Sequence, residues 1–320
     1  MKVLITGITG FVGSHLAEYC LSRGAEVWGT KRWRSNLENI SGILDRIKLM
    51  DADVTDSSAV RRVLDKSKPD WVFHLAAQSY VPASFIQPRE TLHTNIQGQI
   101  NFLHGLKEGL FGKLLAIGSS EEYGQVEEDE IPITEENPLR PLSPYAVSKV
   151  TQDLLSYQYF KSYGLHVVRT RAFNHTGPRR GYVFAESNFA KQIAEIENGE
   201  NKEHIISVGN LEAIRDYTDV RDTVRAYWLA LEKGEPGKIY NICSGRGWKI
   251  QTVLDILLSK TSIKDITVVR DESRMRPSDV PILVGSPGEF KRQTGWEAVI
   301  LFETTLFDLL NYWRKKIPLK

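Results

Sequence analysis

The sequence predicts an α/β fold, in which a doubly wound parallel sheet carries a smaller C-terminal lobe for substrate binding. Three observations lead to this prediction. A glycine-rich turn follows the first apolar segment, short apolar segments then alternate with helical patterns, and the loops lengthen after about residue 172. This alternation favours parallel strands with helices on both faces of the sheet.

The expected strands are short apolar segments, at residues 1–5, 25–29, 47–50, 71–75, 114–117 and 167–171. Helical patterns cover residues 11–22, after the first strand, and residues 57–66, between the third and the fourth. Residues 1–172 are therefore expected to form the domain that contains the main sheet.

Residues 173–320 are expected to form mainly the smaller lobe, with some segments rejoining the main sheet. Pro and Gly cluster at residues 176–181 and 276–288, and helical patterns cover residues 218–232 and 252–259. We expect the lobe to pack over the carboxyl ends of the strands, because open α/β sheets bind their ligands there.

The overall charge excludes some classes of partner. The chain has 320 residues, and 41 Lys and Arg against 40 Asp and Glu leave a net charge of +1. That balance predicts no nucleic-acid or membrane partner, and no apolar segment has the length to cross a bilayer. Two cysteines suggest no disulfide framework, and the seven histidines lack metal-ligand spacing. We expect a cytoplasmic protein without a metal.

The turn after the first strand has the spacing of a dinucleotide site. Gly7 permits the tight turn, Gly10 lets the backbone approach a pyrophosphate, and Gly13 lets the helix pack closely on the strand. The helix N-terminus then offers free N–H groups to the phosphates. A glycine triplet alone could be a simple turn, but its place between strand and helix favours a Rossmann domain that binds a nicotinamide dinucleotide. The expected contacts in this turn are Gly7, Thr9, Gly10, Phe11, Val12 and Gly13.

The end of the second strand favours NADP over NAD. An NAD enzyme usually has an acidic residue there, whereas this chain has Lys31, Arg32, Arg34 and Ser35, which suit a 2′-phosphate. The alternative is a solvated basic loop, or one that contacts another subunit. After the third strand, Asp53 could accept a hydrogen bond from the adenine amino group, and Val54 is expected beside it.

Tyr145 and Lys149 are candidates for catalysis. Four residues apart on a helix, their side chains share one face. A phenol is a poor base at neutral pH, and a neighbouring ammonium group favours the phenolate. Ser119 follows the strand at residues 114–117 and could hydrogen-bond the reacting oxygen beside Tyr145. The alternative for the Tyr–Lys pair is an ordinary amphipathic helix face.

With these motifs in this order, the whole chain resembles the extended short-chain dehydrogenases/reductases that modify nucleotide sugars. Residues 75–79, 94–95, 173–175 and 208–210 look like landmarks of that group. The resemblance implies cofactor contacts at Leu75, Ala76, Ala77, Gln78 and Asn95, and substrate contacts at Ser79 and Val208. It also implies a homo-oligomer, either a dimer or a tetramer.

More narrowly, the chain resembles GDP-mannose 4,6-dehydratases and GDP-6-deoxy-4-keto-hexose reductases. Residues 31–35 and 173–181 look dehydratase-like, whereas residues 242–245 and 276–281 read closer to the reductases. In the dehydratases a Ser/Thr-x-Glu motif supplies the carboxylate that removes the proton from sugar carbon 5, and Ser119-Ser120-Glu121 is similar to it. Glu121 could instead be a solvated carboxylate, and Glu122 is expected to be a bystander.

The resemblance also implies a set of substrate contacts. Asn174 and Asn188 would contact the diphosphate, although Asn188 stands where dehydratases often carry Lys. Arginines would clamp phosphates or ribose, because a guanidinium offers a bidentate fork. The full expected set is Ser79, Ser119, Ser120, Glu121, Asn174, Arg180, Asn188, Lys191, Val208, Arg215 and Arg276. Each Arg could instead be a surface residue or an ion-pair partner, for example Arg215 with a neighbouring Asp.

The sequence therefore predicts a lyase, a GDP-mannose 4,6-dehydratase with internal NADP redox. The nearest alternative is an NADPH-dependent reductase of the 4-keto product. A remote alternative is a regulatory protein that binds NADP without catalysis. The presence of Ser119, Tyr145 and Lys149 argues against it, because a pure binder needs no phenol–amine pair.

Overall fold

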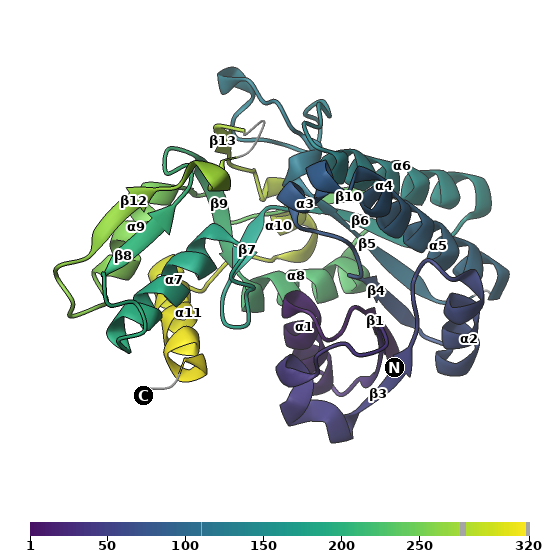
Figure 1. Ribbon diagram of the computed structural model, residues 1–320. Coiled ribbons are helices and arrows are strands. Elements are labelled where there is room, and N and C mark those ends of the chain that lie inside the picture. Colours follow the sequence, from purple (N-terminus) through teal and green to yellow (C-terminus); the bar gives the residue numbers. More distant parts are fainter. Residues whose placement is uncertain (110, 276–279, 318–320) are drawn as a thin grey trace.

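The computed structural model describes residues 1–109, 111–275 and 280–317. Its centre is a parallel sheet of seven strands in the order β10-β6-β5-β4-β1-β2-β3 (Figure 1). The first six strands in the chain have the Rossmann order, so the predicted fold class is confirmed. The strands are β1 (Lys2–Thr6), β2 (Glu26–Lys31), β3 (Ile47–Asp51), β4 (Trp71–His74), β5 (Lys113–Ser119), β6 (Val167–Ala172) and β10 (Ile239–Ile242).

Helices cover both faces of this sheet. Helices α1 (Phe11–Ser22) and α8 (Val220–Lys233) pack together on one face, and α2 (Ser57–Ser67), α5 (Gly98–Gly109) and α6 (Pro144–Tyr163) cover the other. Successive side chains of β1 lie on opposite faces of the sheet. Val3 and Ile5 lie in the core under α1 and α8, and Leu4 lies in the core under α2 and α5. Burial on both faces explains why the strands are continuous apolar runs.

The smaller lobe, at the left of Figure 1, is built around β9 (Ile214–Asp219), which pairs with β7 (Asn174–Thr176), β11 (Gly247–Lys249) and β13 (Ile282–Leu283). A two-stranded sheet of β8 (Ile205–Val208) and β12 (Thr267–Arg270) lies beside it. Helices α7 (Ala185–Glu197), α9 (Ile250–Leu258) and α11 (Phe302–Lys316) share one apolar core. Helix α10 (Gly288–Thr294) packs instead on α8 and β10.

Several shorter elements connect these layers. Between β4 and α5 the chain forms α3 (Val81–Ile86), α4 (Pro88–Leu92) and the π-helical turn η2 (His93–Gln97). In the described part of the chain there are also four 3₁₀ segments: η1 (Glu38–Arg46), η3 (Ser120–Glu122), η4 (Glu128–Glu130) and η5 (Glu272–Arg274).

Most of the expected boundaries agree with the structure. The helix at residues 11–22 is confirmed, and each of the six expected strands lies within two residues of its predicted limits. The helix expected from residue 218 begins at Val220, because Asp219 ends β9 and caps the helix by accepting from the N–H of Arg221 at 2.7 Å. Among the described residues, no helix is long and apolar enough to cross a membrane.

Candidate active site

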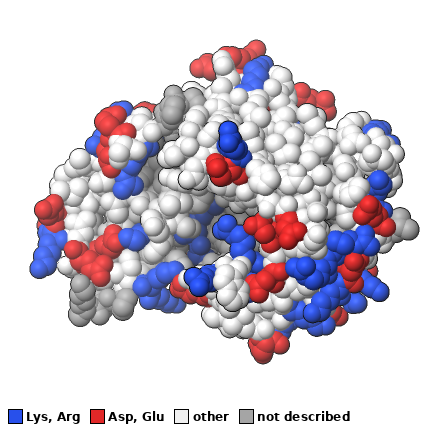
Figure 2. All heavy atoms as spheres, turned by 45° about the vertical axis from the view of Figure 1, so that its right-hand side comes forward, with Lys and Arg blue, Asp and Glu red and all other residues white. Residues whose placement is uncertain are grey.

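A cleft of about 940 Å³ opens at the carboxyl ends of the main sheet. Its walls come from the turn between β1 and α1, the ends of β2 to β6, the start of α6, and the loop after β7 in the smaller lobe. Lys and Arg side chains lie in and around a hollow of the surface (Figure 2), and Lys31, Arg32, Arg179 and Arg180 line the cleft. The lining therefore includes cationic side chains that can face an anionic ligand, beside the acidic Asp53, Glu90 and Glu121.

The glycine turn forms a cradle that side chains would fill. Gly7 has a φ of +67°, and a Cβ at Gly13 would lie 2.4 Å from the Gly7 carbonyl oxygen. Gly10 is the N-cap of α1 and provides no side-chain cap, and the first turn has no acidic residue. Helix N–H groups thus face the cleft, as a bound pyrophosphate requires. The expected contacts Gly7, Thr9, Gly10, Phe11, Val12 and Gly13 all line the cleft.

The basic segment after β2 divides into two parts. Arg32 and Ser35 line the cleft. Lys31 lines it too, but its ammonium group is paired with Asp51 at the end of β3. Arg34 has a φ of 64° and is not part of the lining. Of the four residues expected to hold a 2′-phosphate, Arg32 and Ser35 are therefore the best placed.

The residues expected to contact the adenine and the nicotinamide also line the cleft, except Asn95. Asp53 and Val54 line the cleft, as do residues 75–79. The N–H of Thr55 donates to Asp53 Oδ1 at 2.9 Å and holds the pKa of that carboxyl below its ordinary value. Asn95 is instead fully buried behind this wall, where its Oδ1 accepts from the N–H of Gln78 at 2.8 Å. It holds the loop in place because its amide also donates to Ser148 of α6 at 2.8 Å.

Helix α6 brings Tyr145 and Lys149 to the cleft. The helix begins at Pro144, and the Ser143 hydroxyl caps it by accepting from the N–H of Ala146 at 3.1 Å. Tyr145 is 8% exposed, and burial raises the pKa of its phenol, while a hydrogen bond with Ser119 lowers it. Lys149 Nζ donates to the Ile117 carbonyl oxygen at 2.7 Å and lies 5.9 Å from the Tyr145 ring centroid. Burial lowers the pKa of Lys149 to about 8, which leaves it mostly charged at neutral pH.

Ser119, Ser120 and Glu121 line the same cleft. Ser119 ends β5 and caps η3, and its hydroxyl accepts from the N–H of Glu121 at 3.2 Å. The end of β5 thus places the Ser119 hydroxyl beside Tyr145, and Glu121 adds a carboxylate two residues further along the chain. Glu122, which was expected to be a bystander, does not line the cleft; its side chain is fully buried and accepts from the N–H of Ser119 at 2.8 Å.

The residues expected to contact the sugar nucleotide are only partly brought together. Ser79, Asn174 and Arg180 line the cleft. The Arg180 guanidinium lies 3.4 Å from the centroid of the Phe184 ring and 3.3 Å from Glu186 Oε1. Burial lowers the pKa of Arg180, and the charge of Glu186 raises it. Arg180 is therefore held by the lobe at the wall of the cleft.

Four expected contacts lie in the lobe outside the cleft lining. Asn188 Oδ1 accepts from Arg274 at 2.8 Å, and Lys191 is paired with Glu195 one turn along α7. Val208 is buried in the lobe core, and Arg215 donates to the backbone oxygen of Ile214 at 2.9 Å. Helical spacing explains the pairing of Lys191 with Glu195, and packing of the lobe core explains the burial of Val208. Arg276 lies outside the described residues.

Sequence reasoning missed several residues that line the cleft, among them Tyr227, His175 and Arg179. Tyr227 is a buried residue of α8, and within the described part of the chain its hydroxyl has no hydrogen-bond partner. An unpaired polar atom at the wall of a cleft fits a site that takes a polar ligand. Nothing in the local sequence marked Tyr227, because its position in an amphipathic helix is that of a core residue. Within the same described residues, no group of three or more His, Cys, Asp or Glu could hold a metal.

Comparison with known proteins extends these observations. The model of a protein family described as GDP-mannose 4,6 dehydratase matches residues 4–309. The chain is 34% identical to the GDP-6-deoxy-D-mannose reductase of Pseudomonas aeruginosa, over 99% of this chain and 98% of that protein. It is 32% identical to a GDP-mannose 4,6-dehydratase of Vibrio cholerae, over 96% of this chain and 92% of the relative.

Solved structures share the fold over the whole chain. The structure of RMD from Pseudomonas aeruginosa complexed with NADPH has a TM-score of 0.85 and 32% identity, and covers 98% of this chain and 99% of that one. A UDP-glucose 4-epimerase of Thermotoga maritima with UDP-glucose has a TM-score of 0.90 and 27% identity, with coverage of 99% and 100%. These neighbours bind a nicotinamide dinucleotide or a nucleotide sugar.

Proposed function

Because the chain belongs to the GDP-mannose 4,6 dehydratase family, we propose that it is an NADP-dependent lyase that converts GDP-mannose to GDP-4-keto-6-deoxymannose. The observation that carries this proposal is the convergence of Ser119, Glu121 and Tyr145 in one cleft. The hydroxyls of Ser119 and Tyr145 suit oxidation at sugar carbon 4, and the Glu121 carboxylate beside them suits proton removal at carbon 5.

When bound, NADP would supply the reversible hydride chemistry that oxidation at carbon 4 and reduction at carbon 6 require. The glycine turn and Arg32 would hold its phosphates. Tyr145 takes the proton of the 4-hydroxyl, and the hydrogen bond with Ser119 lowers the pKa of its phenol. The Lys149 ammonium group, 5.9 Å from the ring centroid, would also favour the phenolate. The 4-ketone acidifies the hydrogen on carbon 5. Glu121 removes that proton and passes it to the hydroxide that leaves carbon 6, which departs as water. The proton that Tyr145 took then goes to carbon 5, so the overall change is the loss of one water.

The second candidate is a reductase that converts a GDP-4-keto-6-deoxyhexose to a GDP-6-deoxyhexose. The end-to-end alignment with the Pseudomonas reductase favours it, since 99% of one chain and 98% of the other are matched. In that reaction Tyr145 donates a proton to the carbon 4 oxygen, and Glu121 has no proton to remove.

An assay of the purified wild-type protein tests the proposal. With GDP-mannose and a small amount of NADP, the 4-keto product should accumulate well beyond the amount of cofactor, without lasting formation of NADPH. A protein that leaves GDP-mannose unchanged but oxidises one NADPH for each 4-keto sugar supplied is the reductase. A protein inert in both assays contradicts both candidates.

We also propose that Arg32 and Ser35 make the site select NADP. NADP should bind more tightly than NAD by about 1–3 kcal/mol, the value of a few charge-assisted hydrogen bonds. Arg32→Ala should weaken NADP binding roughly tenfold or more and leave NAD binding nearly unchanged, as measured by calorimetric titration of both dinucleotides. Lys31→Met is the matched control and should have a smaller effect, because its ammonium group is paired with Asp51. Equal wild-type affinities would assign the basic loop to another role.

A further inference from the structure

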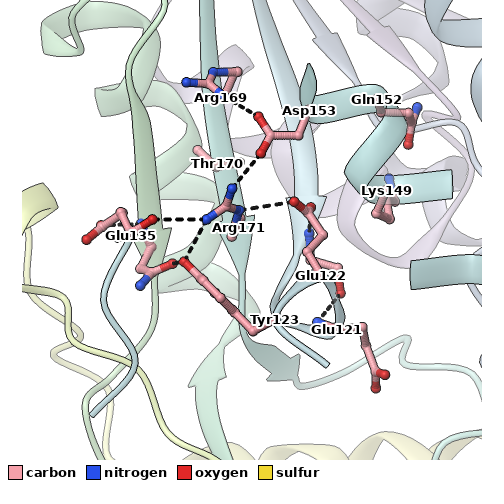
Figure 3. A network of polar contacts seen from close by, with 12 residues as sticks. Glu121, Glu122, Tyr123, Glu135, Lys149, Gln152, Asp153, Arg169, Thr170 and Arg171 are labelled. Atoms are coloured by element: carbon pink, nitrogen blue, oxygen red, sulfur yellow. Dashed lines mark hydrogen bonds and ion pairs between the residues drawn. The ribbon is translucent and has the colours of Figure 1, made fainter. Parts of the chain in front are cut away.

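A buried network of charged side chains lies directly behind the catalytic cleft (Figure 3). It joins Glu122, at the end of η3, to Arg171 on β6 and to Asp153 on α6, with Arg169 at its far end. Their side chains are between 0% and 11% exposed. None of the four lines the cleft. The network therefore would not touch the substrate itself.

Glu122 fixes the backbone of Ser119. Its Oε1 accepts from the N–H of Ser119 at 2.8 Å, which closes a reciprocal capping box with the Ser119 hydroxyl. In Figure 3 the Glu122 side chain turns toward Arg171, whereas Glu121 turns the other way. A Cβ at Gly118 would come within 2.2 Å of Glu122 Oε1, so glycine there leaves the space that the carboxylate occupies.

Arg171 connects this anchor to the neighbouring elements. Its Nε donates to Glu122 Oε2 at 3.0 Å, and its Nη2 donates to Asp153 Oδ2 at 2.7 Å. The third nitrogen, Nη1, donates to the Tyr123 hydroxyl at 3.1 Å and to the Glu135 carbonyl oxygen at 3.3 Å. The planar guanidinium thus sets the positions of both carboxylates at once.

Asp153 joins the network to the helix that carries the catalytic pair. Tyr145, Lys149 and Asp153 stand four residues apart, so they form one stripe along α6. The first two reach the cleft, and Asp153 reaches Arg171. Figure 3 shows Lys149 and Asp153 projecting from the same helix. Short, buried contacts thus run from Ser119 through Glu122 and Arg171 to Asp153, which lies two turns from Tyr145 on the same helix.

Stability alone gives a poor account of this network. Taking two carboxylates and two guanidiniums out of water is costly, and apolar side chains of similar size often serve a core equally well. Burial and the charge of Asp153 raise the pKa of Glu122, while Arg171 and the N–H of Ser119 lower it. What the network provides that an apolar core cannot is a directed acceptor for the N–H of Ser119.

We propose that Glu122 is a positioning residue, which holds Ser119 at a fixed place relative to Tyr145 through its buried link to Arg171 and Asp153. The proposal rests on the roles proposed for Ser119 and Tyr145. It is the same for the dehydratase and the reductase, because both reactions use that pair at carbon 4.

Two double variants that leave the net charge of the protein unchanged test this proposal. Glu122→Leu with Arg171→Met removes the acceptor and one charge of each sign, and leaves Asp153 paired with Arg169. Its kcat should fall roughly 10- to 100-fold, the scale expected for small misplacements of reacting groups, with KM and Tm nearly unchanged. Glu122→Gln with Arg171→Met has the same charge but restores an acceptor oxygen, and it should recover most of kcat.

Amide hydrogen exchange gives a second measurement that does not depend on activity. The N–H of Ser119 should exchange faster in the Leu/Met variant and remain protected in the Gln/Met variant. The matched control is Glu197→Leu with Arg314→Met, which neutralises an ion pair of 2.6 Å between α7 and α11 in the smaller lobe. The control should change neither kcat nor the protection of Ser119.

A folded Leu/Met variant with wild-type kcat and a protected Ser119 amide would overturn the proposal. So would an equal loss of kcat in both network variants, since restoring the acceptor would then have no effect. If the wild-type protein acts on neither sugar nucleotide, the proposed function has failed, and Ser119 exchange alone decides whether Glu122 holds the serine.

Discussion

Replacing Tyr145 by Phe is expected to abolish turnover while NADP binding persists. The substitution removes one hydroxyl from a ring that is 8% exposed, so the packing of α6 on the sheet should be retained. Loss of the proton acceptor should lower kcat by about 10²–10⁴-fold, the usual contribution of general acid–base catalysis. Steady-state kinetics and titration with NADP give the two measurements.

The matched control for this variant is Tyr163→Phe, at the other end of the same helix, where the side chain is 51% exposed. It loses the same hydroxyl and should keep wild-type kinetics. A Tyr145→Phe enzyme with wild-type kcat would remove Tyr145 from the mechanism, for the dehydratase and the reductase alike.

Replacing Glu121 by Gln should abolish the dehydration and spare the cofactor site. An amide cannot accept the carbon 5 proton, so turnover of GDP-mannose should fall by about 10²–10⁴-fold. In deuterated water the wild-type product should carry deuterium at carbon 5, and the variant should form almost none of this product. Mass spectrometry of the sugar product measures both effects.

Glu128→Gln provides the control for Glu121, because Glu128 is an exposed carboxylate a few residues further along the same segment. It should leave turnover and deuterium incorporation unchanged. If Glu121→Gln retains full dehydration, another group removes the proton. If the wild-type enzyme only reduces 4-keto sugars, Glu121 keeps at most a positioning role.

The parts of the molecule that the sequence predicted well are those with local signals. The glycine turn, the Tyr145–Lys149 spacing and the alternating strands depend on residues within a few positions of one another. These signals were sufficient for six strands of the main sheet, the first helix, the glycine turn and the Tyr145–Lys149 pair, whereas residues 75–79, Asn174 and Arg180 were expected only from the family resemblance.

The contacts that the sequence did not reveal involve partners far along the chain. Glu122 was expected to be a bystander, and its buried pairing was not foreseen, because Arg171 lies 49 positions away and on another strand. Asn95 holds Ser148 across 53 positions, and the pairing of Lys31 with Asp51 requires β2 and β3 to be side by side. Such contacts follow from topology, which local periodicity does not encode.

The return of the chain to the main sheet limits how this protein could be re-engineered. Strand β10 extends the sheet beyond β6, and α8 covers the face beside α1, although both come after the first segments of the smaller lobe. A single splice near residue 172 would therefore exchange more than sugar specificity: it would also replace Tyr227 and the layer that packs beneath the glycine turn. Transplanting the recognition surface of a relative requires several junctions, each in a loop that crosses between the two lobes. The molecule has two lobes in space but no single boundary between them along the chain.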